Sequence, residues 1–300
     1  MEMMTYLGWP NCTRLANDTM ELFVTTDVGP RIIHFGFAGG ANEFATVSNQ
    51  LGQTGGDEWR IYGGHRLWHA PEAQPRTYYP DNTPITVEAH DGFVRFSQPP
   101  ESTTGLQKEI DIALAATGAQ VTVTHRIRNH TLWPLELAPW ALSVMAPGGT
   151  AVLPLPPRGR HENNLLPNTQ LILWAYTNMA DRRWHWGEQY ILLRQEPGNT
   201  TPQKIGAFVT DGWVGYARDG RFFLKTFAVQ PDAPYPDIHA NVELFTCDFM
   251  LEVETLGPLV KLDPGTAVTH TEHWFLFDGI PTPTNDAGVT AHILPLLPTR

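Results

Sequence analysis

Apolar and polar side chains alternate in short runs along most of the chain, which is the two-residue period of a β-strand. The 26 glycines and 26 prolines are spread among these runs and interrupt any helical period. The pattern predicts about fifteen short strands. The clearest of them span residues 19–25, 31–37, 85–90, 93–97, 106–114, 120–129, 132–145, 204–209, 213–217, 222–227, 244–255 and 268–277.

The strongest pattern lies in residues 241–277, NVELFTCDFMLEVETLGPLVKLDPGTAVTHTEHWFLF, which predicts two strands joined by a Pro-Gly turn. The first strand places Glu252 and Glu254 on one face. That face either displays charge to water or lines a groove in which one carboxylate acts as a base. The second strand has a polar-rich face that carries His270, Glu272 and Trp274.

Many short strands with long connecting loops and no regular alternation with helices predict an all-β fold, a large antiparallel sandwich. A length of 300 residues is ample for one such core, so a single domain over residues 1–300 is expected. The proline-rich run 152–168 predicts a long surface loop. Such loops on a rigid sandwich often carry binding residues.

Charge narrows the range of partners. The chain has 31 acidic and 20 basic residues and a net charge of -11, which repels a phosphate backbone, so no nucleic-acid partner is expected. The N-terminal residues lack the basic stretch followed by an apolar stretch that marks an export signal, so none is expected. No segment has 18 consecutive apolar residues, so no membrane span is expected. The cytoplasm is then the default location. The two cysteines are interpreted as reduced thiols.

Residues 58–72, EWRIYGGHRLWHAPE, are the richest in side chains suited to binding or catalysis. In an extended segment Arg66 and Trp68 share one face, and His65 and His69 share the other. An indole beside a guanidinium suits a sugar, because the aromatic face packs on C–H groups and arginine donates several hydrogen bonds to hydroxyls. The alternative is a buried tryptophan with an arginine bound to backbone carbonyls.

Three further positions each allow two interpretations. Trp140, in an apolar run with two prolines, is either core or the wall of a groove. His185 belongs to DRRWHWGE, which either plugs a core edge or lines a pocket. Lys225 interrupts the apolar run FFLKTF and either reaches outward to solvent or is paired inside a site.

Several motifs together resemble the galactose mutarotase superfamily of β-supersandwich proteins, and more closely a branch of it described as a domain of unknown function. They are GGHRLWHAPE, an N-H-T-L-W-P segment leading to APW, NVELFT, and LEVETLGPLVKLDPGTAVTHTEHWFL. In aldose 1-epimerases of that superfamily a C-terminal glutamate is the base at the anomeric hydroxyl, and a central histidine protonates the ring oxygen. Glu254 is similar to that glutamate, with Glu252 as the alternative. Arg66 resembles the arginine that contacts sugar hydroxyls.

The sequence departs from the superfamily pattern at the central histidine. The matching segment reads Pro139-Trp140, and neither residue can protonate a ring oxygen. His65, His69, His125 and His185 are the possible substitutes. His65 and His69 are the expected catalytic acids, with Glu254 as the base.

The resemblance therefore implies a carbohydrate-active enzyme that uses glutamate and histidine as base and acid, either as an aldose 1-epimerase or as a lyase or glycoside-processing variant. The expected partner is a small-molecule carbohydrate, with no nucleic acid and no membrane. The sequence does not set the oligomeric state. The expected substrate-binding residues are Arg66, Trp68, Glu72, Trp140, His185, Lys225, Glu243 and Glu252.

Two other classes of function compete with this one. A non-catalytic carbohydrate-binding protein is the main alternative, because ten tryptophans with scattered arginines and acids suit sugar stacking. No cofactor and no metal are expected, because the twelve histidines show no strong ligand spacing. A metal enzyme would draw on His65, His69, His270, Glu252, Glu254 or Glu272.

Overall fold

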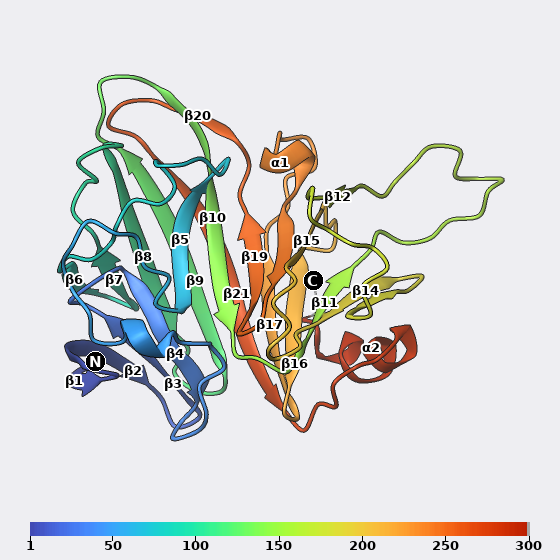
Figure 1. Cartoon of the computed structure of the whole chain (residues 1–300), viewed down its shortest axis with the longest axis horizontal. Helices are drawn as coiled ribbons and strands as arrows, with labels where there is room; N and C mark the ends of the chain where they lie inside the picture. The colour runs from blue at the N-terminus through green and yellow to red at the C-terminus, as the bar shows by residue number, and fades with distance from the viewer. Residues whose placement is uncertain (299–300) are drawn as a thin grey trace.

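The computed structural model describes residues 1–298 and contains two large antiparallel sheets that pack into a sandwich (Figure 1). In spatial order, the eleven-stranded sheet has β1 (Glu2–Tyr6), β2 (Trp9–Ala16), β3 (Met20–Thr25), β4 (Arg31–Phe37), β5 (Gly64–Ala70), β10 (Leu135–Met145), β19 (Leu251–Leu256), β18 (Val242–Thr246), β15 (Gln203–Ala207) and β12 (Leu171–Leu173), with β20 (Val260–Leu262) beside β10. The ten-stranded sheet has β13 (Trp184–Trp186), β14 (Tyr190–Arg194), β11 (Thr150–Pro154), β16 (Trp213–Arg218), β17 (Arg221–Phe227), β21 (Ala267–Asp278), β9 (Gln120–Asn129), β8 (Leu106–Leu114), β7 (Phe93–Ser97) and β6 (Thr86–His90). The predicted all-β antiparallel sandwich is confirmed.

Helical structure in residues 1–298 is limited to α1 (Pro236–His239), α2 (Asp286–His292) and two short 3-10 turns, η1 (Ser48–Gln50) and η2 (Leu294–Leu296). Within that part of the chain, no helix has the length and apolar character needed to cross a membrane. The loop that follows β11 extends away from the sandwich (Figure 1), as the prolines predict.

The prediction of one strand over residues 244–255 is wrong at its centre. The chain turns back at residues 247–250, and β18 and β19 pair as an antiparallel hairpin. The turn is held by a hydrogen bond from the Cys247 N–H to the Met250 carbonyl (3.2 Å) and by the Thr246 hydroxyl, which donates to the same carbonyl (2.9 Å). Neither glycine nor proline marks this turn, so the alternating pattern runs through it without a visible break.

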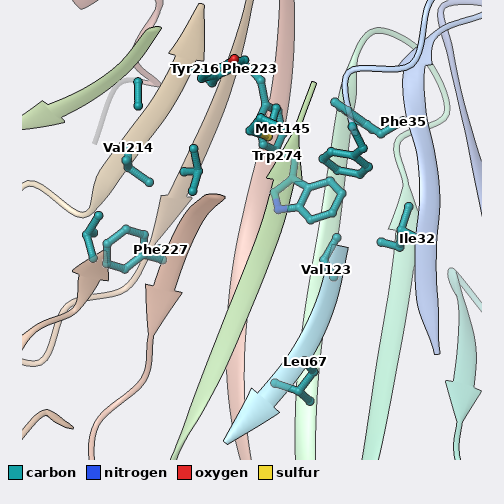
Figure 2. Packing of buried hydrophobic residues seen from close by; sticks show 14 of the residues in the cluster. Ile32, Phe35, Leu67, Val123, Met145, Val214, Tyr216, Phe223, Phe227 and Trp274 are labelled. Carbon is teal, nitrogen blue, oxygen red and sulfur yellow. The ribbon is translucent and has the colours of Figure 1, made fainter. Parts of the chain in front are cut away.

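The core between the sheets is centred on the indole of Trp274, which is fully buried (Figure 2). The ring centroids of Phe35 and Phe223 lie 5.4 and 5.5 Å from that of Trp274, both in edge-to-face contact. Phe35 comes from one sheet, whereas Phe223 and Trp274 come from the other. Aromatic packing therefore joins the two layers at the point where β21 is most buried.

Polar groups also join the two sheets inside the core. Lys225 of β17 donates from Nζ to Glu272 Oε1 of β21 (2.8 Å) and to the carbonyl of Val253 in β19 (3.0 Å). Trp274 Nε1 donates to the other oxygen of Glu272 (2.7 Å), and Thr255 donates to Oε1. Burial alone would raise the pKa of Glu272, but the Lys225 ammonium opposes it strongly and the pKa falls to about 2. The Glu272 carboxylate is therefore ionised and fully paired.

Histidines continue this network. His125 Nδ1 lies 2.9 Å from the carbonyl of His270, and His65 Nε2 lies 2.7 Å from His125 Nε2. Because a carbonyl can only accept, Nδ1 of His125 carries the proton, and its Nε2 accepts from His65. Burial lowers the pKa of both rings, which agrees with neutral imidazoles. His65 Nδ1 then accepts from the hydroxyl of Ser143 (2.8 Å).

Acid should destabilise the protein through its buried histidines. Burial lowers the pKa of His69 and His270 to about 3 and that of His34 to about 4. The unfolded chain takes up these protons near pH 6.5, so it binds more protons than the folded chain at lower pH. The free energy of unfolding should fall as the pH drops below about 6.5, by up to about 1.4 kcal/mol per pH unit for each such histidine. Urea denaturation at several pH values measures this slope.

Two variants separate the buried histidines from the remaining titrating groups. His270→Gln removes one buried ring and should flatten the slope, whatever its effect on stability at neutral pH. His161→Gln changes a histidine in the exposed loop after β11 and should leave the profile unchanged. A free energy of unfolding that stays constant on acidification would contradict the prediction.

Candidate functional site

A cavity of about 400 Å³, called here the first cavity, lies on the face of the eleven-stranded sheet that points away from the core. Strands β5, β10, β19, β18 and β15 form its floor. Residues outside these strands complete the wall. The lining residues are Trp59, Ile61, Arg66, Trp68, Glu72, Tyr78, Trp140, Leu142, Tyr176, Lys204, Phe245, Cys247, Phe249, Met250, Glu252 and Glu254.

The pairing register gathers the charged side chains on this floor. Arg66 lies opposite Leu142, Leu142 opposite Glu254, and Glu254 opposite Glu243, so one row of side chains crosses four strands. The next row brings Glu252 into line with Phe245 and Lys204. Side chains opposite one another on neighbouring antiparallel strands are in contact range. Residues separated by more than 180 positions in the sequence therefore meet.

The guanidinium of Arg66 lies over two aromatic rings. Its guanidinium carbon lies 4.5 Å from the ring centroid of Trp68 and 5.8 Å from that of Trp59. Arg66 Nη2 pairs with Glu252 Oε1 at 3.1 Å. Burial raises the pKa of Glu252, whereas Arg66 lowers it. The Nε and Nη1 groups of Arg66 are buried and have no hydrogen-bond partner among the described residues, so they remain available as donors to a ligand.

Lys204 is a central residue of the site that sequence reasoning missed. Its Nζ lies 2.7 Å from Glu243 Oε2 and 3.4 Å from Glu254 Oε2. The ammonium also lies over the rings of Trp140 and Trp174, at 4.8 and 4.7 Å from their centroids. Burial alone would lower the pKa of Lys204, but the two carboxylates raise it well above its usual value. The only sequence signal was one lysine beside an apolar strand, a weak pattern shared with Lys225.

Glu254 is fixed by one oxygen and free at the other. Oε2 accepts from Trp140 Nε1 (2.8 Å) and from Lys204. Oε1 is buried and has no hydrogen-bond partner within residues 1–298. A carboxylate held in this way presents one lone oxygen in a defined direction, which suits a base.

Glu243 is the second carboxyl that pairs with Lys204. Its side chain is fully buried, and burial raises its pKa well above the usual value although Lys204 opposes the shift. Glu243, Glu252 and Glu254 face only the two cations Arg66 and Lys204 on this floor, which leaves one carboxyl in excess. The floor therefore holds more buried carboxyls than cations, and burial favours the protonated form of Glu243.

A second cavity, of about 340 Å³, adjoins the first. Four residues line both, namely Glu72, Tyr78, Trp140 and Lys204. The second cavity is completed by Ala73, Gln74, Trp174, Asp237 and Glu243. Tyr78 donates its hydroxyl hydrogen bond to Glu72 at the shared wall.

Known structures resemble this one over most of its length. A galactose mutarotase-like protein from Lactobacillus casei is 10% identical with a TM-score of 0.55, over 89% of this chain and 100% of that chain. A galactose mutarotase related enzyme from Lactobacillus acidophilus is 9% identical with a TM-score of 0.53, over 90% and 99%. A provisionally named aldose 1-epimerase from Klebsiella pneumoniae is 10% identical with a TM-score of 0.59, over 97% and 84%. No family model and no curated protein matches the sequence.

The chain has the galactose mutarotase-like fold. This confirms the architecture that the sequence motifs predicted. An identity of one residue in ten supports the fold but does not assign an activity. The activity of this galactose mutarotase-like chain must therefore be inferred from its own side chains.

Most of the residues predicted for the site do meet there. Arg66, Trp68, Glu72, Trp140, Glu252 and Glu254 line the first cavity, and Glu243 lines the second. For Trp140 the sequence allowed either core or groove wall, and the structure shows both, because the side chain is buried in a hydrophobic cluster and also lines the two cavities. The two faces predicted for residues 58–72 are also observed, with Arg66 and Trp68 toward the cavity and the two histidines on the opposite side.

The other predicted residues lie elsewhere. Among the described residues that line the two cavities, none is a histidine. His65 is hydrogen-bonded inside the core, and His69 is buried on the same side of β5, so the expectation that either protonates a sugar does not fit this geometry. Lys225 neither reaches solvent nor enters the cavity, because it pairs with Glu272 between the sheets. His185 is half-buried on β13 and lies 3.8 Å from Asp286.

One group of core residues has the composition of a metal site. Ligand atoms of His65, His125 and Glu272 lie within 4.8 Å of one another. Both oxygens of Glu272 already accept hydrogen bonds, and the ammonium of Lys225 is 2.8 Å from one of them. A cation placed here would lie beside this buried positive charge. The donor set therefore fits a hydrogen-bonded network better than a metal centre.

Replacing Lys204 should destabilise the fold. Lys204→Met leaves Glu243 and Glu254 buried without their shared cation, which should lower the free energy of unfolding by about 3 kcal/mol. Lys261→Met, at an exposed lysine of β20, is the matched control and should change stability by less than about 0.5 kcal/mol. Adding Glu254→Gln to Lys204→Met should recover part of the loss in urea denaturation at neutral pH. Equal stability of Lys204→Met and the native protein would refute the ion pairing.

Proposed function

We propose that this protein is a carbohydrate-active enzyme that performs acid-base chemistry at the anomeric centre of a sugar, in the manner of an aldose 1-epimerase. The observation that carries the proposal is the free, buried Oε1 of Glu254 at the floor of an aromatic cavity. Trp68 and Trp140 offer faces for the C–H groups of a sugar ring, and Arg66 offers two unpartnered donors for hydroxyls.

Ring opening requires a base at the anomeric hydroxyl and an acid at the ring oxygen. Both sugar oxygens are bonded to the anomeric carbon, so the two catalytic groups must be close together. Glu254 and Glu243 are opposite neighbours on β19 and β18, and each carboxyl is paired with Lys204. We assign Glu254 as the base and the protonated Glu243 as the acid. This places Glu243 in the role for which the sequence suggested a histidine.

Lys204 and Arg66 position the substrate and balance charge in this proposal. As Glu254 takes up a proton and Glu243 releases one, the total charge of the pair is unchanged. Lys204 stays within reach of both carboxyls and stabilises whichever one is ionised. The proton can therefore move across the sugar without leaving an unpaired charge in a buried site.

Glu254→Gln should abolish the base. We expect at least about a hundredfold loss of kcat for anomer exchange with little change in KM, because the amide keeps the shape of the side chain and cannot accept the proton. Polarimetry or NMR exchange with freshly dissolved pure anomers of several neutral aldoses measures the rate. Glu136→Gln, at an exposed position of β10, is the control. If the native protein accelerates exchange of none of these aldoses, the epimerase reaction is excluded.

Glu243→Gln tests the acid separately. The native rate should decline at high pH as Glu243 loses its proton, and burial moves this decline above the usual range of a carboxyl. The Glu243→Gln variant should have a low rate at all pH values, and its rate should not decline further at high pH. A pH profile identical to the native one would show that Glu243 does not donate the proton.

A non-catalytic sugar-binding protein is the second candidate. It is favoured by the absence of histidine among the described lining residues and by the ion pairing of Lys204 with Glu243 and Glu254. A ligand that binds only the folded state raises Tm. A rise in Tm with a sugar that the protein does not interconvert would select this function.

A further inference from the structure

The second cavity is built as a binding site in its own right. Trp174 is half-buried above β15, where the backbone of Gly206 allows it to approach, because a Cβ at Gly206 would lie 3.3 Å from the indole. Lys204 lies over the same indole and over Trp140. Each cavity therefore has an aromatic wall, and Trp140 and Lys204 line both.

The turn that carries Asp237 is conformationally unusual. Asp237, Ile238 and His239 have φ values of 50°, 59° and 81°, so three successive residues other than glycine occupy the left-handed region. This is costly for a β-branched isoleucine, whose side chain is 77% exposed and gains little from packing. The turn nevertheless brings Asp237 to the wall of the second cavity. Strain retained at such a position is typical of a functional site.

The charge of the second cavity limits what it can hold. Glu72, Asp237 and Glu243 line it, and Lys204 is the only cation among its described lining residues. Lys204 is already paired with Glu254 and Glu243, and with the proton proposed on Glu243 the charged carboxylates of this cavity are Glu72 and Asp237. An anionic ligand would meet repulsion from the carboxylates without a free cation. Aromatic walls with carboxylate acceptors instead suit the hydroxyls and C–H faces of a neutral sugar.

We infer that the natural ligand has two linked sugar units. The unit that reacts lies in the first cavity with its anomeric carbon toward Glu243, and a second, neutral unit, attached at the hydroxyl next to that carbon, lies in the second cavity between Trp174 and Asp237. This rests on the proposed function, because the first cavity must accept a sugar. The shared wall of Glu72, Tyr78, Trp140 and Lys204 puts the two units side by side, as a glycosidic bond requires.

Isothermal titration calorimetry with the full chain tests the inference directly. The ligands are glucose and galactose as single units, kojibiose and sophorose as neutral 1,2-linked disaccharides, maltose, cellobiose and lactose as 1,4-linked ones, and a 1,2-linked aldobiouronic acid whose non-reducing unit is glucuronate. We expect at least one neutral disaccharide to bind about tenfold more tightly than either single unit, and the uronate to bind no better than a single unit.

Variants locate the second unit. Trp174→Ala should reduce disaccharide affinity to that of a single unit and leave the affinity for glucose and galactose unchanged. Trp133→Ala, at an exposed tryptophan that lines neither cavity, should change nothing. Asp237→Asn retains a side chain that tolerates the left-handed region and removes the charge, so it should strengthen binding of the aldobiouronic acid about tenfold.

The outcomes separate this inference from the proposed function. Single units that bind as tightly as every disaccharide, or a Trp174→Ala variant that loses affinity for both equally, would overturn the two-unit ligand and leave the proposed function in place. Tight disaccharide binding that Trp174→Ala abolishes, without any turnover, would support the two-unit ligand and overturn the catalysis. No binding of any of these sugars would overturn both.

Discussion

The ion pair between Lys225 and Glu272 holds the strand on which the candidate site depends. Lys225 also donates to the carbonyl of Val253, the residue between Glu252 and Glu254, from the opposite sheet. A buried ammonium with a fixed partner resists displacement, because moving it would leave a carboxylate unpaired in the core. The core network thus fixes the position and orientation of β19 relative to the opposite sheet. Glu252 and Glu254 project from the other face of β19 into the first cavity.

The two faces of the eleven-stranded sheet therefore have different functions on the same strands. On β5, His65 belongs to the core network and Arg66 to the cavity, and on β19, Thr255 and Glu254 divide in the same way. Neighbouring residues along a strand point to opposite faces. A change in register by one residue would therefore turn the core side chains toward the cavity and the cavity side chains into the core. The packing of the core and the arrangement of the cavity residues therefore depend on the same strand register.

Charge balance decides what the cavity floor can do. Three buried carboxyls share two cations, and burial raises the pKa of Glu243 well above its usual value although Lys204 opposes the rise. In the proposed mechanism this rise lets a buried carboxyl, rather than a histidine, serve as the acid. At Pro139-Trp140, where the sequence departs from the superfamily pattern, Trp140 donates its indole N–H to Glu254.

The sequence by itself determined the fold class, the alternation on β5 and β21, and the sharing of one face by Arg66 and Trp68 and of another by Glu252 and Glu254, because a strand's side-chain period is local and can be read residue by residue. It left open whether those faces meet water, the core or a cavity. Only the tertiary structure decided that Lys204 joins Glu243 and Glu254, that Lys225 belongs to the core, and that His65 and His69 lie behind the site. These outcomes depend on the register between strands far apart in the chain and on the turn at residues 247–250. Register is set by the packing of the whole sandwich, which no local pattern contains.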